Sequence, residues 1–229
     1  MKNKHNISKI LYFAVLISFI VPIVFLIVKI TLISCGVISD SKAISDYTLM
    51  LLECFLGALV IHLPSFLERK FKFTVPTAMY ILYLVFLYCA ITLGEVRNFY
   101  YRFPHWDTIL HAMSSLMSGF LGFMVVDFLN KEKHTSVSLS PIFVSLFAFC
   151  FGLSIGALWE IYEFSFDEIL GLNMQKFRLE NGMELVGHKA LSDTMKDIIV
   201  DGLGALLASV IGYFNLCVEK RTKIKNEVN

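Results

Sequence analysis

The chain has 229 residues, of which 56% are hydrophobic and only 17% are charged, and its mean hydropathy is +0.68. This composition lies outside the range of soluble globular domains and indicates an integral membrane protein. The formal net charge of +1 comes without a concentrated basic face, which argues against nucleic acid as a partner and leaves the lipid bilayer as the expected environment.

Six segments are long and apolar enough to cross a hydrocarbon layer of about 30 Å. In chain order they cover roughly residues 10–33, 47–66, 75–94, 107–129, 140–163 and 193–217. The first run is longer than a signal-peptide core and lacks a small-residue cleavage site, so we expect it to be retained as a span. The pattern therefore predicts an all-α fold, a polytopic membrane helical bundle in which residues 1–229 form a single integral-membrane domain.

The distribution of Lys and Arg predicts the orientation. If both termini lie inside, twelve basic residues fall in inner segments, namely Lys2, Lys4, Lys9, Arg69, Lys70, Lys72, Lys131, Lys133, Lys220, Arg221, Lys223 and Lys225. Six fall in outer loops, namely Lys42, Arg97, Arg102, Lys176, Arg178 and Lys189. The positive-inside rule therefore predicts cytoplasmic N- and C-termini.

The sixth span carries three acids at every fourth residue, Asp193, Asp197 and Asp201. This spacing places all three on one face of a helix. An ionised carboxylate at membrane depth costs on the order of 2.5–3.5 kcal/mol, so we expect this face to meet protein, water, protons or a cation.

Two other spans have polar outer ends under the same orientation. Span four opens with Asp107 and His111, and span five closes with Glu160 and Glu163, each pair one helical turn apart. A histidine among carboxylates on neighbouring helices is a ligand set typical of divalent metal ions such as Mg²⁺, Mn²⁺, Zn²⁺ or Fe²⁺. Shared protons are the alternative, since adjacent carboxylates raise one another's pKa. The candidate metal or proton site consists of Asp107, His111, Glu160, Glu163, Asp193 and Asp197, with Asp201, Lys196 and Glu53 as secondary members.

A structural explanation competes with the functional one for some of these residues. Asp107 and Asp193 are expected in the first turn of their helices, where a carboxylate caps free N–H groups. Glu160 and Glu163 are expected at a helix C-terminus, where the dipole disfavours anions, so capping does not explain them. Lys196 is expected to neutralise one acid at most.

The outer connection, roughly residues 164–192, contains alternating residues around an Asn181-Gly182 turn. This pattern predicts a short hairpin, and we expect it to form a small extracytoplasmic flap over the acidic cluster. A loop without regular structure is the alternative.

The motifs of the last four spans resemble the YjdF-like family of bacterial inner-membrane proteins. The resemblance rests on Asp107-Thr-Ile-Leu-His111 followed by Gly119-Phe120, on Glu160-Ile-Tyr-Glu163, and on Asp193-Thr-Met-Lys-Asp197 followed by Gly204-Ala205. It implies a multi-pass protein of the bacterial cytoplasmic membrane and supports the positions of the candidate site. Asp201 lies outside the resemblance, and we expect it to tune the site and not to form it.

Three functions fit these observations. The first is an intramembrane metal-dependent enzyme that acts on a lipid or envelope precursor, with metal-activated water as the nucleophile. The second is a transporter in which the same acids bind a cation or protons; the few polar residues of the inner half disfavour it. The third is a structural or regulatory membrane subunit. The sequence leaves open whether the protein is an enzyme.

Overall fold

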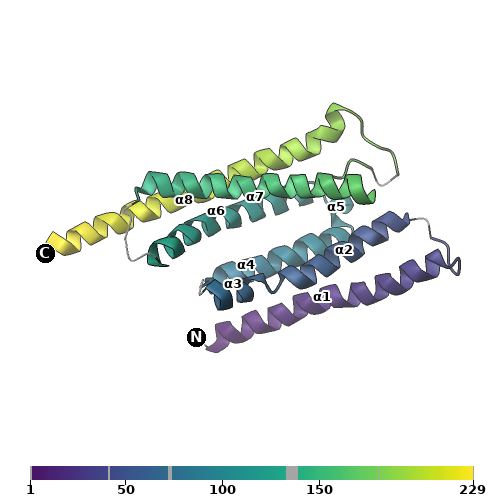
Figure 1. The fold of residues 1–229 in the computed structure, drawn as a ribbon, viewed down its shortest axis with the longest axis horizontal. Helices are drawn as coiled ribbons and strands as arrows, with labels where there is room; N and C mark the ends of the chain where they lie inside the picture. Colours follow the sequence, from purple (N-terminus) through teal and green to yellow (C-terminus); the bar gives the residue numbers. More distant parts are fainter. Residues whose placement is uncertain (1, 41, 72–73, 133–138, 180, 229) are drawn as a thin grey trace. The chain divides into compact units, whose positions relative to one another are not determined.

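The computed structural model describes residues 2–40, 42–71, 74–132, 139–179 and 181–228. Over these ranges the chain is almost entirely helical (Figure 1). The elements are α1 (Lys2–Ser34), α2 (Ile44–Val60), α3 (Leu63–Phe71), α4 (Thr77–Leu87), the π-helix η1 (Tyr88–Val96), α5 (Phe99–Arg102), α6 (Trp106–Glu132), α7 (Pro141–Leu170) and α8 (His188–Val228).

Six helical segments are long and apolar enough to cross a membrane, which confirms the predicted membrane helical bundle. They are Ile7–Ser34, Ile44–Phe71, Thr77–Val96, Trp106–Asn130, Pro141–Leu170 and His188–Thr222. The orientation of the termini stays a prediction. Lys72 and Lys133, which contribute to that prediction, lie outside the described residues.

The chain forms two compact units. Unit 1 consists of Met1–Leu110 with Tyr162–Ala190, and unit 2 of His111–Ile161 with Leu191–Asn229. Helices α6, α7 and α8 each contribute residues to both units. The single domain expected over residues 1–229 stays a prediction.

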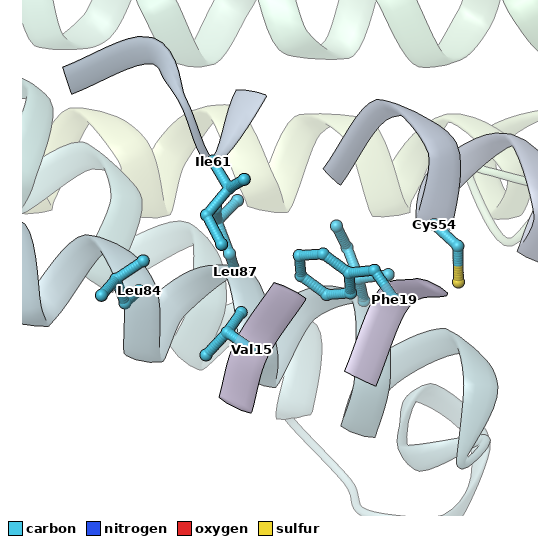
Figure 2. Close-up of a cluster of buried hydrophobic side chains, with 7 residues drawn as sticks. Val15, Phe19, Cys54, Ile61, Leu84 and Leu87 are labelled. Carbon is cyan, nitrogen blue, oxygen red and sulfur yellow. The ribbon is translucent and has the colours of Figure 1, made fainter. Parts of the chain in front are cut away.

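Unit 1 has an apolar core where α1 packs against α2, α4 and η1 (Figure 2). Phe19 of α1 is fully buried beside Cys54 and Ile61 of the second span and Leu84 of the third. Gly57 allows this approach, because a Cβ at that position would collide with the side chain of Ile91.

Two spans of unit 1 depart from regular α-helix. The second span is interrupted between α2 and α3 at Ile61–His62, just before Pro64, which has no N–H for a continuous helix. The third span changes from α4 into the π-helix η1, and the N–H of Arg97, the residue after η1, donates to the carbonyl of Thr92 five residues earlier at 3.0 Å. Such segments are rare and recur at functional sites.

Unit 2 packs through small residues on α6, α7 and α8. A Cβ at Gly119 would meet Ala208, one at Gly122 would meet the backbone of Ala148, and one at Gly152 would meet Ala205. Within a membrane, helices associate by such close contact because lipid supplies no hydrophobic force between them.

Large apolar side chains cover the outside of the helices. In α1, for example, Ile10 and Val21 are 69% and 61% exposed. Continuous apolar exposure of this kind is a liability in water and is the expected surface in lipid.

Two helix ends differ from the prediction. Helix α7 continues to Leu170, so Glu160 and Glu163 lie inside the helix and not at its C-terminus. Helix α8 begins at His188, so Asp193 is not in its first turn. The prediction was wrong because hydropathy marks where a helix leaves the apolar layer, whereas backbone hydrogen bonding continues beyond it.

The predicted hairpin is present in a minimal form. Arg178 and Glu184 form an isolated antiparallel bridge, and Gly182 adopts a positive φ of 82° in the turn between them. The N–H of Leu185 donates to the carbonyl of Phe177 at 2.7 Å. Glu180 lies outside the described residues, and the expected position of this flap over the acidic cluster stays a prediction.

Candidate functional site

A histidine lies between two buried carboxylates in unit 2. Nδ1 of His111 lies 3.2 Å from Oδ2 of Asp201, and its Nε2 lies 3.7 Å from Oε1 of Glu160. The exposed fractions are 7% for His111, 0% for Asp201 and 4% for Glu160. Both nitrogens of one imidazole therefore face carboxylates that are shielded from solvent.

Asp197 lies next to this group. It is one turn before Asp201 on α8, it is 5% exposed, and its carboxylate offers a ligand atom within 4.8 Å of one offered by His111. Asp197 and Asp201 thus lie on one face of α8, as their four-residue spacing predicted, and both come near the imidazole of His111.

Close helix packing makes room for these side chains. A Cβ at Gly156 of α7 would overlap the carboxylate of Asp201, and one at Gly204 of α8 would overlap Oγ of Ser115. That hydroxyl donates to the carbonyl of His111 at 2.8 Å. The two glycines therefore bring α7, α8 and α6 close enough for His111 and Asp201 to meet.

One carboxylate oxygen of Asp201 has no hydrogen-bond partner among the described residues. Oδ1 of Asp201 is buried and makes no hydrogen bond to any residue that the structure describes. An unsatisfied carboxylate oxygen in an apolar interior costs free energy, so the position favours a proton or a cation at this oxygen.

The remaining predicted residues of unit 2 lie on α8. Asp193 is half-buried one turn before Asp197. Lys196 is exposed and forms no ion pair with another described residue. The acids at Asp197 and Asp201 are therefore not neutralised by Lys196.

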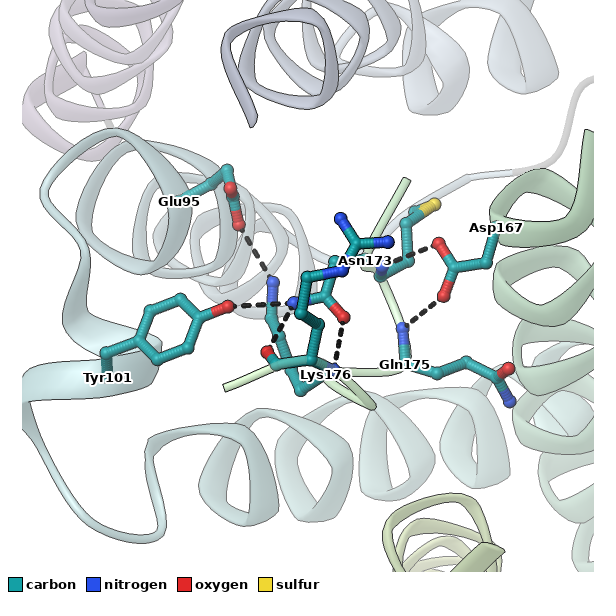
Figure 3. Close-up of polar contacts among 8 residues, drawn as sticks. Glu95, Tyr101, Asp167, Asn173, Gln175 and Lys176 are labelled. Atoms are coloured by element: carbon teal, nitrogen blue, oxygen red, sulfur yellow. Dashed lines mark hydrogen bonds and ion pairs between the residues drawn. The ribbon is translucent and has the colours of Figure 1, made fainter. Parts of the chain in front are cut away.

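Unit 1 holds a second polar group, around Lys176 (Figure 3). Nζ of Lys176 donates to Oε2 of Glu95 at 3.1 Å and lies over the rings of Tyr100 and Tyr101, at 4.6 and 5.8 Å from their centroids. Burial disfavours the charged amine, but Glu95 and Glu53 outweigh it and raise the pKa of Lys176 above its ordinary value of 10.5. Glu53, a secondary member of the predicted site, belongs to this group.

Asp107 and Glu163, two further residues of the predicted site, belong to unit 1. Asp107 is in the first turn of α6, as predicted, one turn before His111 in the same helix. Glu163 lies one turn after Glu160 in α7. Burial raises the pKa of Tyr100 well above its ordinary value, and the carboxylates of Glu53, Asp107, Glu95 and Glu163 raise it further.

No motif in the sequence assigns Glu95, Asp167, Asn173 or Lys176 to a site. The side chain of Asn173 contacts the hydroxyl of Tyr101 and both backbone groups of Arg178, and Asp167 accepts from the N–H groups of Met174 and Gln175 at 2.7 and 3.0 Å. Lys176 and Glu95 are 81 residues apart, and no periodicity relates them.

The family of predicted membrane proteins described as DUF2238 matches residues 8–217. The chain belongs to the DUF2238 family. A relative of the DUF2238 protein in Thermotoga maritima, itself named only as an uncharacterized protein, is 32% identical over 130 residues. The match covers 56% of this chain and 57% of the relative, so the chain spans a little more than half of that protein's length. No solved structure matches the chain.

The chemistry open to the DUF2238 protein follows from the donors in unit 2. One imidazole and three carboxylates give a mixed nitrogen and oxygen set that suits Zn²⁺, Fe²⁺ or Mn²⁺. Two ligand atoms about 2.1 Å from one metal ion lie about 3.0–3.4 Å apart at ordinary coordination angles. The 3.7 Å between His111 Nε2 and Glu160 Oε1 is a few tenths of an ångström longer.

Proposed function

We propose that this DUF2238 protein is an intramembrane metal-dependent enzyme that acts on a lipid or envelope precursor. The proposal places it in the cytoplasmic membrane of a bacterium, in keeping with its resemblance to YjdF-like proteins. The proposed ligands and general base are drawn from Asp107, His111, Glu160, Glu163, Asp193 and Asp197.

The observation that carries the proposal is the contact between His111 and Asp201. Histidine ligands of metal ions commonly donate their second ring N–H to a carboxylate, which fixes the tautomer and the ring orientation. With the proton on Nδ1, His111 donates to Asp201 at 3.2 Å and presents the lone pair of Nε2 on the side of Glu160. Asp201 is then a positioning residue for His111.

A bound divalent cation would supply Lewis-acid activation of water or of a phosphoryl oxygen. The protein would hold several carboxylates, without a matching number of basic side chains, in an interior shielded from water. His111 and Asp197 would bind the ion, and a carboxylate outside the ligand set would accept the proton of the attacking water.

A second candidate, a proton or cation transporter, has one observation in its favour. Both nitrogens of His111 face buried carboxylates, so a proton could pass from one carboxylate to the other through the imidazole. A structural or regulatory subunit, the third candidate, requires neither a metal ion nor a titrating histidine.

Metal content of the purified protein tests the enzyme proposal. We expect the wild type to retain a divalent ion after incubation with Zn²⁺, Mn²⁺ or Fe²⁺ followed by gel filtration, and His111→Ala and Asp197→Asn to lose it. Asp201→Asn should lower the affinity by about 10- to 100-fold, because second-shell carboxylates have effects of that size. Asp127→Asn is the matched control, because Asp127 is an exposed acid on α6, the helix of His111, and this variant should retain the ion.

Proteoliposomes separate the two candidates. Proton flux that persists in a chelator and is lost in His111→Ala would favour the transporter. A wild type that holds no ion, or equal retention in all four variants, would contradict the metal site.

A further inference from the structure

Unit 2 has a hollow away from the His111 group, where the start of α7 meets the C-terminal part of α8. Its volume is about 300 Å³. It is lined by Pro141, Ile142, Tyr213, Cys217, Lys220 and Arg221.

The residues from α8 share one helical face. Cys217 follows Tyr213 by four residues, and Lys220 and Arg221 follow Cys217 by three and four. Both basic residues are exposed, and neither forms an ion pair with another residue that the structure describes. The hollow therefore carries two positive charges without a carboxylate in its lining, and the positive end of the α7 dipole adds to them.

The hollow lies at the end of the membrane-spanning segments. The span in α7 begins at Pro141, and the span in α8 ends at Thr222. Tyrosine and basic side chains at this depth are typical of the layer of lipid headgroups. Beside the hollow, Ile142, Phe214 and Val218 are 68%, 62% and 61% exposed, so an apolar surface continues from the basic residues toward the membrane interior.

We propose that this hollow binds the phosphate headgroup of an anionic phospholipid. Lys220 and Arg221 bind the phosphate, Arg221 with two parallel N–H donors where geometry allows, and Ile142 and Val218 contact the acyl chains. A volume of about 300 Å³ admits a phosphoglycerol group but not a whole lipid. The adjoining apolar side chains favour a lipid over free phosphate, because free phosphate would make no contact with them.

This inference does not depend on the proposed metal site. None of the lining residues belongs to the His111 group, so either proposal can fail alone.

Native mass spectrometry of the full-length protein in detergent tests the site, with phosphatidylglycerol and phosphatidylcholine as the two probes. We expect the wild type to retain phosphatidylglycerol in preference to phosphatidylcholine. Lys220→Gln/Arg221→Gln should lower phosphatidylglycerol retention by about 25-fold, since each of the two basic residues near the membrane surface contributes about a fivefold effect. Retention of phosphatidylcholine should not change.

The matched control is Arg69→Gln/Lys70→Gln, which removes two exposed basic residues from the last turn of α3. It should keep wild-type retention of phosphatidylglycerol. A second variant, Ile142→Glu, leaves both cations in place and puts a carboxylate in the hollow; it should also lose phosphatidylglycerol.

An equal loss of phosphatidylglycerol retention in the control variant would show that retention follows the overall charge of the protein. That result would overturn the proposed site. Retention that is unchanged in Lys220→Gln/Arg221→Gln would overturn it as well. Inorganic phosphate that competes with phosphatidylglycerol at equal concentration would show that the apolar side chains add no affinity, and would overturn the lipid as the preferred occupant.

Discussion

Asp201 shows how a carboxylate is accommodated inside an apolar helix. It is the most buried acid of the described chain, and one of its oxygens contacts Nδ1 of His111. Its space exists because residue 156 on the facing helix has no Cβ. The contact with the histidine offsets part of a burial that would otherwise cost several kcal/mol, and the glycine supplies the space.

We predict that Gly156→Ala destabilises the protein by about 1–3 kcal/mol, the range for overpacking, because the new methyl group would overlap the Asp201 carboxylate. The melting temperature in detergent measures this effect. Retention of a divalent ion should fall in the same variant, since Asp201 would shift away from His111.

Gly202→Ala is the matched control for this prediction. Its Cβ would meet only Leu153 Cδ1, at an ordinary contact distance of 3.8 Å. Alanine is also the better helix former, so this variant should be neutral or slightly stabilising. Equal melting temperatures for the two variants would contradict the packing of Gly156 against Asp201.

At the scale of elements, the segment 171–178 is held on unit 1 by buried polar contacts and not by regular structure. Lys176 adopts a positive φ of 52° and reaches Glu95 at the end of η1, while Asn173 contacts Tyr101 of α5. Leu172 and Met174 pack against Leu49 of α2. The connection between α7 and α8, which reads as a loop in the sequence, is thus a fixed part of this unit.

We predict that Lys176→Met destabilises the protein by about 3–5 kcal/mol, because it leaves Glu95 as a buried charge without its cation. The double variant with Glu95→Gln should recover most of the loss, so the two effects should be non-additive in a double-mutant cycle. Lys189→Met, at an exposed position near the start of α8, is the control and should have little effect.

The pH dependence follows from the raised pKa of Lys176. The stabilisation is fully present below the ordinary pKa of 10.5 and is lost only as the pH rises through the higher value in the folded state. The difference in melting temperature between wild type and Lys176→Met should therefore hold from neutral pH to pH 9. If the stability losses of the two single variants added up in the double variant, Lys176 and Glu95 would not form one interaction.

At the scale of the whole molecule, the six spans could be predicted because apolar length is a local property of the sequence. The helix ends near Glu163 and Asp193 could not be predicted. A helix continues by backbone hydrogen bonding beyond its apolar stretch, into residues with polar side chains. The four-residue spacing of Asp197 and Asp201 correctly predicted one helical face. The partners of that face required the structure, because His111 and Asp201 are 90 residues apart and meet where Gly156 of α7 and Gly204 of α8 let the helices approach.

The excess of basic residues in the segments assigned to the inside predicts that both termini are cytoplasmic. Reporter fusions after Lys133 and after Lys225 should therefore report the cytoplasm, and an insertion at Asn181 should report the opposite side. The start of α7 and the end of the α8 span would then face the cytoplasmic leaflet, whose anionic lipids attract basic side chains by about 1 kcal/mol each. A cytoplasmic Asn181 would reverse the orientation, and Lys220 and Arg221 would then lie at the opposite leaflet, away from that attraction.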